Sequence, residues 1–254
     1  MKAFFIGLQF LTRISIVKQT SWTAADFGRS VRFFPLVGVV LGSIYAGAAY
    51  LLLVVLPQQG ILFPEHIRNV LLLLLPIIMT GGLHCDGFMD TMDGIFSGRS
   101  REKMLLIMKD SCVGSNAVVA FIAYILFEYA LLADFDASYL PTALFLMPII
   151  ARLCMTMAIV CFPYARPEGM GKAFAEHANR SALMFAVFST LLFVAPWGIF
   201  AIISMLATIA AAFCFAKYVT KILGGLTGDV YGAITHLGEL FALFTFLCAT
   251  YIMI

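Results

Sequence analysis

Charge is scarce in this chain. Its 254 residues include only 16 lysines and arginines and 14 aspartates and glutamates, so that 12% of the residues are charged and 62% are hydrophobic. A soluble globular domain has about 25% charged and about 45–50% apolar residues. The composition therefore excludes an ordinary soluble domain and predicts a polytopic membrane protein.

The chain also lacks the patterns that indicate several other classes of protein. Its six cysteines are scattered without CxxC spacing, so they indicate neither a disulfide framework nor a zinc site. No basic stripe indicates nucleic-acid binding, and repeats, low-complexity tracts and long linkers are absent from the sequence. We therefore expect one membrane-embedded domain over residues 1–254. We expect its partner to be the lipid membrane and not a nucleic acid.

Long apolar runs fill most of the sequence. A helix needs about 20 mostly apolar residues to cross a membrane. The candidate spans are residues 33–56, 70–83, 117–133, 139–162, 182–197, 198–218 and 234–254. The apolar run 4–11 is too short to span, and we expect it to form an interfacial or re-entrant helix. The predicted fold class is all-α, an integral membrane helix bundle with about seven transmembrane helices.

The basic residues are divided unevenly between the predicted loops. Fourteen of the sixteen fall in segments on one side of the membrane, Arg68 falls on the other side, and Arg152 falls within a span. Lysine and arginine are enriched in cytosolic loops of membrane proteins. We therefore predict a cytosolic N-terminus and an external C-terminus.

Acidic residues, although rare, are concentrated in residues 81–110. Asp86, Asp90 and Asp93 stand at i, i+4 and i+7, so in a helix their side chains line one face. Three like charges on one stripe repel one another unless a cation lies among them. Clustered carboxylate oxygens favour a hard ion, Mg²⁺ or else Mn²⁺. The alternative is a solvated acidic helix end.

The depth of Asp86 in the membrane helps to decide between a metal site and a solvated acidic helix end. A helix that starts near Val70 and rises about 1.5 Å per residue crosses the membrane by about Met89, which places Asp86 at the cytosolic surface. Gly81 and Gly82 would let a neighbouring helix or a substrate approach closely. An ionisable group at membrane depth is costly. We therefore predict that the three aspartates form a metal site.

Other polar residues near the predicted cytosolic surface favour phosphate chemistry. Arg99 follows the acidic run and Arg166 follows the fourth span. Guanidinium groups beside a metal neutralise phosphate oxygens, although basic residues also serve as ordinary membrane anchors. The glycine-rich residues 224–232 hold Thr227 and Asp229 at a helix start, where backbone N–H groups can bind an anion.

Two charged residues are expected in the membrane interior. Glu128 and Arg152 lie about 15–17 Å from the cytosolic ends of their predicted helices, at about 1.5 Å per residue. Charges in a low dielectric need partners. Their equal depth on consecutive helices predicts that they pair with each other.

Short motifs along nearly the whole chain together resemble the cobalamin synthase family. They are FLTRI at residues 10–14, FPLVG at 34–38, GGLHCDGFMDTMDG at 81–94, IMKDS at 107–111, YAR at 164–166 and GGLTGD at 224–229. The acidic run at 81–94 is the most specific of these motifs in its length and order.

The resemblance implies a membrane enzyme, an adenosylcobinamide-GDP ribazoletransferase of cobalamin biosynthesis. Its substrates would be adenosylcobinamide-GDP and alpha-ribazole, or alpha-ribazole 5'-phosphate. Its products would be adenosylcobalamin, or its 5'-phosphate, and GMP, and its cofactor would be Mg²⁺. The implied location is the prokaryotic cytoplasmic (inner) membrane with the active site facing the cytosol. A homo-oligomer and association with other late cobalamin-pathway enzymes stay open.

The implied reaction suggests roles for the remaining polar residues. A ribose hydroxyl attacks the phosphorus attached to cobinamide and GMP leaves, which requires positioning and charge neutralisation. We expect Asp110, or alternatively His84, to be the general base for that hydroxyl. We expect Arg13, Arg99 and Arg166 to contact phosphate.

Two other functions are alternatives. A lipid-making CDP-alcohol phosphotransferase also uses an Asp-Gly-rich membrane helix and a divalent metal, but its pattern has Ala-Arg after the first Asp-Gly pair, where this chain has Asp90. A transporter of divalent metal or corrinoid would show broken helices in two matched halves, or acids in the middle of several spans. The acidic residues here cluster at one predicted cytosolic opening of the bundle, which counts against a transporter.

Overall fold

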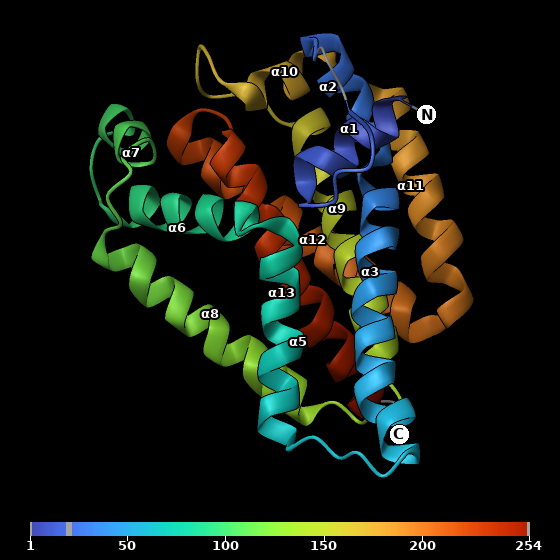
Figure 1. Cartoon of the computed structure of the whole chain (residues 1–254). Coiled ribbons are helices and arrows are strands. Elements are labelled where there is room, and N and C mark those ends of the chain that lie inside the picture. The colour runs from blue at the N-terminus through green and yellow to red at the C-terminus, as the bar shows by residue number, and fades with distance from the viewer. Residues whose placement is uncertain (1, 19–21, 253–254) are drawn as a thin grey trace.

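The structure has the all-α architecture that the composition predicts (Figure 1). The computed structural model describes residues 2–18 and 22–252, and within these ranges the one β contact is an isolated bridge between Tyr164 and Leu226. The α-helices are α1 Lys2–Leu11, α2 Ala24–Ser30, α3 Phe34–Tyr50, α4 Leu56–Gln58, α5 Glu65–Thr80, α6 Leu83–Phe96, α7 Arg101–Ile107, α8 Ser115–Asp134, α9 Leu140–Cys161, α10 Met170–His177, α11 Arg180–Val194, α12 Ile199–Leu223 and α13 Gly228–Ile252.

Several helical stretches are long and apolar enough to cross a membrane. In the described part of the chain these six stretches are Ala24–Gln58, Ser115–Asp134, Leu140–Cys161, Arg180–Trp197, Ile199–Leu223 and Gly228–Tyr251. The bent pair of α5 and α6 makes seven if it counts as one broken span. The prediction of about seven transmembrane helices is therefore confirmed.

The second predicted span is broken by two glycines. α5 ends at Thr80, α6 begins at Leu83, and the two helices are bent by 91°. Gly81 and Gly82 have φ angles of +65° and +75°, a conformation that glycine adopts without the steric cost that a side chain brings. The prediction of one helix continuing to Met89 is therefore wrong. Instead, α6 runs across the bundle, nearly perpendicular to α5 (Figure 1).

Arg13 holds the corner between α5 and α6. Its backbone N–H donates to the carbonyl oxygen of Met79 at 2.8 Å. Its guanidinium group occupies the space that a side chain at position 81 would need, because a Cβ built on Gly81 would overlap Arg13 Nε. The φ angle thus favours glycine at this position, and a side chain there would displace the end of the Arg13 side chain. The segment that follows α1 is thereby attached to the start of α6.

Short helices cover one end of the bundle. α1, α2 and α10 lie together near the N-terminus, and the C-terminus lies at the opposite end (Figure 1). The rings of Phe10, Phe27 and Phe174 join these three helices, with centroids 4.9–5.8 Å apart. Asp26 accepts a hydrogen bond from Lys2 at 3.1 Å, which ties α2 to α1. The prediction of a short N-terminal helix is confirmed, since α1 has 10 residues.

The centre of the bundle is formed by α9 and α13, which are largely buried. α9 packs against α3, α11, α12 and α13. Glycines allow the close approaches. A Cβ on Gly42 of α3 would overlap the carbonyl oxygen of Phe145, and a Cβ on Gly238 of α13 would lie 3.3 Å from the Ala151 side chain. Small residues at helix contacts are typical of membrane bundles.

A buried ion pair links these two central helices. Arg152 of α9 is fully buried, and its Nη1 donates to the carboxylate of Glu239 on α13. The predicted pairing of Arg152 with Glu128 is therefore wrong. Glu128 lies on α8, which packs against α5, α6 and α13, and it lines a small cavity with Tyr124 and Glu239. Equal depth in the sequence does not show which helices are neighbours.

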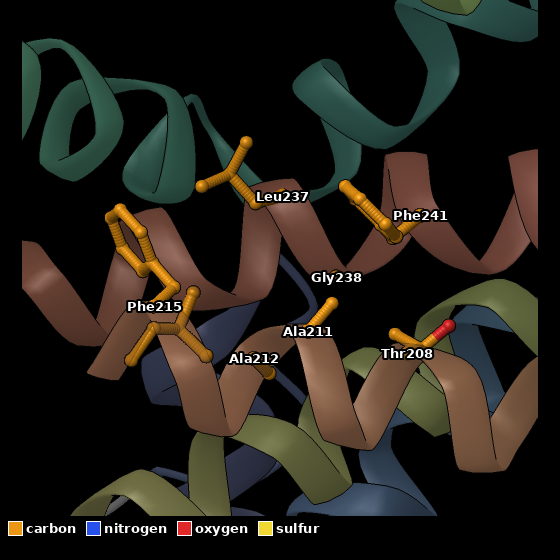
Figure 2. Close-up of a pocket in the computed structure, with 8 residues that line it drawn as sticks. Thr208, Ala211, Ala212, Phe215, Leu237, Gly238 and Phe241 are labelled. Atoms are coloured by element: carbon orange, nitrogen blue, oxygen red, sulfur yellow. The ribbon is translucent and has the colours of Figure 1, made fainter. Parts of the chain in front are cut away.

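An apolar groove of about 150 Å³ lies between α12 and α13 (Figure 2). Thr208 and Phe215 line it from α12, and Leu237, Gly238 and Phe241 line it from α13. No residue that lines this groove is charged. It therefore offers no ion pair to a phosphate and does not fit the predicted phosphate chemistry.

The predicted orientation can be tested at the two ends of α8. Ser111 and Ser138 flank this helix and both are exposed. In a variant without the six native cysteines, we expect Ser111→Cys to react with a membrane-impermeant maleimide only in inside-out vesicles. Ser138→Cys should react only in intact spheroplasts. The reverse pattern would contradict a cytosolic N-terminus.

A double-mutant cycle tests the buried ion pair. Arg152→Met and Glu239→Gln should each destabilise the protein by about 3–5 kcal/mol, because each leaves an unpaired buried polar or charged group. The double variant should recover part of this loss in thermal unfolding in detergent. Glu128→Gln is the matched control and should show no such coupling to Arg152→Met. If Glu128→Gln couples to Arg152→Met as strongly as Glu239→Gln does, Arg152 pairs with Glu128 after all.

Candidate active site

Asp86 lies where two hollows meet. The first is an open groove of about 560 Å³ beside α1 and α6, and Arg13, Gly81 and Asp86 are among its lining residues. The second is a cavity of about 200 Å³ walled by α1, α6, α9, α10 and α13, and it includes both Asp86 and Asp229. Because Asp86 is exposed, its carboxylate is accessible to a molecule in either hollow.

Glycines bring α6 into contact with the first turn of α13. A Cβ on Gly87 would come 2.7 Å from the carbonyl oxygen of Asp229, and a Cβ on Gly232 would come 3.4 Å from Gly87 Cα. A side chain at position 87 would push the two helices apart, whereas Gly232 packs against Gly87 at ordinary contact distance. The close approach brings Asp86 and Asp90, which flank Gly87 on α6, toward Asp229.

Two loops place Arg166 beside Asp229. The loop after α9 and the loop after α12 are joined by two backbone hydrogen bonds of 2.8 Å, from Ala165 N–H to the Leu226 carbonyl and from Leu226 N–H to the Pro163 carbonyl. Arg166 follows this bridge, and its Nη2 lies 2.8 Å from Asp229 Oδ2. The ion pair therefore depends on the contact between the two loops.

Thr227 connects this ion pair to the start of α13. Its buried hydroxyl lies 3.2 Å from Asp229 Oδ2, to which it donates, and accepts a hydrogen bond from the backbone N–H of Val230 at 3.3 Å. A threonine hydroxyl in this position satisfies a free N–H group of the first helical turn. Thr227 and Asp229 thus lie at a helix start, as the glycine-rich segment predicts.

Three carboxylates and one guanidinium group form an acidic cluster, consisting of Asp86, Asp90, Asp229 and Arg166. Asp90 is half-buried, and it interacts electrostatically with the other three members and with Asp93. One positive group does not balance three negative groups. A bound cation would neutralise the excess charge, and carboxylate oxygens are ligands that Mg²⁺ prefers.

The acidic cluster offers only part of a metal coordination shell. Within residues 2–18 and 22–252, no group of three or more His, Cys, Asp or Glu side chains is placed to hold a metal ion. Mg²⁺ commonly binds through one or two carboxylates and fills its remaining positions with waters and substrate phosphates. Asp86 and Asp90, about one helical turn apart on α6, fit that partial role.

Asp93 contacts the backbone at the start of α8. Its carboxylate accepts hydrogen bonds from the N–H groups of Gly114 and Ala117, the latter at 3.1 Å. A carboxylate at a helix N-terminus satisfies free N–H groups and complements the helix dipole. This contact accounts for an acid at position 93 without a metal, and the metal-binding role of Asp93 stays a prediction.

Asp110 lies in the exposed loop between α7 and α8. It shares an open hollow of about 300 Å³ with Asp93, and not the two hollows that contain Asp86. The backbone N–H of Cys112 donates to its carboxylate at 3.0 Å. This hydrogen bond lowers the pKa of Asp110 below its ordinary value, which weakens the residue as a base.

His84 is the other predicted base, and it lies inside the bundle. Its side chain is 2% exposed, and neither ring nitrogen has a hydrogen-bond partner among the described residues. It lines the 200 Å³ cavity together with Asp86, and on its other side it lines a much smaller cavity with Glu128 and His236. His84 therefore lines the larger cavity, and both of its ring nitrogens are buried.

The two remaining predicted arginines differ in position. Arg13 is exposed and lines the open groove with Asp86. Arg99 is exposed beyond the far end of α6 and lines neither of the hollows that contain Asp86. The structure thus brings Arg13 and Arg166 to the site and leaves Arg99 outside it.

Sequence reasoning missed the apolar wall of the 200 Å³ cavity. Phe10 of α1, Met155 of α9, Phe174 of α10 and Tyr231 of α13 contribute to this wall. Each is one apolar or aromatic residue in a largely apolar chain, so composition and spacing do not single it out. Of these four residues, Phe10 alone lies in one of the family-like motifs.

Comparison with known proteins shows the family. A family model described as "Cobalamin-5-phosphate synthase" matches residues 3–247. Curated proteins named adenosylcobinamide-GDP ribazoletransferase from Clostridium acetobutylicum, Desulfitobacterium hafniense and Acetivibrio thermocellus are 37%, 39% and 36% identical to this chain. The alignments cover 96%, 94% and 97% of this chain and 95%, 94% and 97% of theirs. No solved structure matches it. The chain therefore belongs to the cobalamin-5-phosphate synthase family of enzymes.

Proposed function

We propose that the chain is an adenosylcobinamide-GDP ribazoletransferase. It joins adenosylcobinamide-GDP to alpha-ribazole, or alpha-ribazole 5'-phosphate, and releases GMP. Relatives with this name match nearly the whole chain. The structural observation that supports the proposal is the acidic cluster at the junction of two hollows, assembled from α6, α13 and the loop after α9.

The reaction replaces one oxygen on a phosphorus atom by another. A ribose hydroxyl oxygen bonds to the phosphorus attached to cobinamide, and the bond from that phosphorus to the bridging oxygen of the pyrophosphate breaks. GMP departs with the bridging oxygen, and the hydroxyl proton passes to a base. Because two substrates must meet at one phosphorus, a site in which two hollows share Asp86 fits this reaction.

We propose Mg²⁺ as the cofactor, held by Asp86 and Asp90. When bound, Mg²⁺ would neutralise charge on the pyrophosphate and on the departing phosphate. Arg13 contacts phosphate oxygens from the open groove, and Arg166 contacts them from the side of α13. Asp229 holds the Arg166 guanidinium in place and is therefore a positioning residue.

We propose His84 as the base that accepts the hydroxyl proton. His84 lines the same cavity as Asp86, whereas Asp110 lies in a separate hollow. We also propose that the site faces the cytosol of a prokaryotic cytoplasmic membrane. This orientation follows the excess of basic residues on the side where the short helices lie.

A transfer assay tests the proposed function. Protein purified in detergent and supplied with adenosylcobinamide-GDP, alpha-ribazole and Mg²⁺ should form adenosylcobalamin and GMP in equal amounts. Transfer from a CDP-alcohol without corrinoid product would favour the lipid synthase instead. Accumulation of corrinoid or metal in proteoliposomes without GMP release would favour a transporter.

Substitutions along α6 test the metal site. Asp86→Asn and Asp90→Asn each remove a charged ligand at nearly constant size, and each should lower turnover at least about 100-fold at limiting Mg²⁺. GMP release against Mg²⁺ concentration measures the effect.

Asp93→Asn is the discriminating control. It should mainly lower thermal stability, by about 0.5–2 kcal/mol, because it weakens the contact at the start of α8, and it should leave the Mg²⁺ requirement unchanged. If Asp93→Asn raises the Mg²⁺ requirement as much as Asp86→Asn does, all three aspartates bind the metal.

A further inference from the structure

We propose that the 200 Å³ cavity binds the planar base of alpha-ribazole. The cavity is enclosed by α1, α6, α9, α10 and α13, and Asp86 and Asp229 are on its wall. The proposal rests on the proposed function, which makes alpha-ribazole a substrate. It goes further, because it assigns the nucleoside to one of the two hollows and names the residues that select it.

The wall of the cavity is chemically suited to a flat apolar ring. Met155 and Phe174 are buried, with exposed fractions of 5% and 3%, and Phe10 lies beside Phe174 with ring centroids 4.9 Å apart. Thioether and aromatic groups make favourable contacts with aromatic rings. On the side of α6 and α13, Gly87 and Gly232 contribute backbone to the cavity wall.

Tyr231 lines the cavity and has a buried hydroxyl without a partner among the described residues. Tyr231 is 1% exposed, and no atom of the described residues accepts from or donates to its hydroxyl. A buried hydroxyl without a hydrogen bond is costly, so a ligand that supplies an acceptor is favoured. A benzimidazole that carries ribose on one ring nitrogen keeps its second ring nitrogen as an acceptor. The Tyr231 O–H can donate to that nitrogen.

The other parts of the two substrates fit the cavity less well. Guanine presents several donors and acceptors, whereas the buried wall offers only Tyr231 and His84 as polar side chains without partners in the described chain. The corrin ring system is far larger than this cavity. The carboxylates of Asp86 and Asp229 repel a phosphate that enters without a cation. The open groove with Arg13 is therefore left to the pyrophosphate and the corrinoid.

This placement also orients the reaction. With the planar ring of alpha-ribazole inside the cavity, the ribose lies toward the opening at Asp86. There a ribose hydroxyl can reach a phosphorus atom in the open groove. His84 lines the cavity next to this opening and can accept the proton. The cavity thus determines which end of the nucleoside faces Asp86.

Kinetics with two site variants and one matched control test the assignment. Tyr231→Phe removes the hydroxyl, and Met155→Ala removes part of the apolar wall. Each should raise the KM for alpha-ribazole, roughly three- to tenfold for Tyr231→Phe, and leave the KM for adenosylcobinamide-GDP unchanged. Tyr45→Phe removes another buried hydroxyl that has no partner in the described structure, on α3 and outside the cavity; neither KM should change.

The outcomes separate this proposal from the proposed function. If wild-type protein makes no cobalamin, the proposed function fails, and equilibrium dialysis of alpha-ribazole against the same variants still tests the cavity. If transfer occurs but the variants raise only the KM for adenosylcobinamide-GDP, the guanine or the corrinoid occupies the cavity and the inference is overturned. A loss of kcat with both KM values unchanged would also overturn it, because it would show a structural role alone.

Discussion

The site depends on the backbone corner at Gly81 and Gly82. Two consecutive glycines with positive φ end α5 and turn the chain by 91°, so α6 crosses the bundle instead of leaving the membrane along α5. Arg13 packs into the space that the missing side chain leaves. The corner therefore positions the aspartates of α6 and brings an arginine from the N-terminal segment to the same groove.

The second requirement is that α6 and α13 approach closely enough for their acids to meet. Gly87 makes this approach sterically possible, and the paired loops add Arg166 to balance part of the negative charge. α13 is in turn joined to α9 by the buried pair of Arg152 and Glu239. Because the ion pair fixes the middle of α13, the first turn of α13 can hold Asp229 beside the like charges of Asp86 and Asp90.

Several features of this protein were determined by the sequence alone. The scarcity of charge predicts a membrane protein, and the apolar runs predict about seven spans, because a helix needs about 20 mostly apolar residues to cross lipid. The spacing of Asp86, Asp90 and Asp93 places the acids on one face if the segment is helical, and α6 contains all three. The family-like motifs predict the cobalamin synthase family, which the comparisons confirm.

The tertiary structure alone decided which residues are neighbours. Helix depth predicts that Arg152 pairs with Glu128, but α13 supplies the partner, since position along a helix does not specify the helix beside it. Helical periodicity groups Asp93 with the other aspartates, whereas α8 provides N–H groups that bind it. The cavity wall comes from five helices. Contacts between distant segments form only when the chain packs, so local patterns do not reveal them.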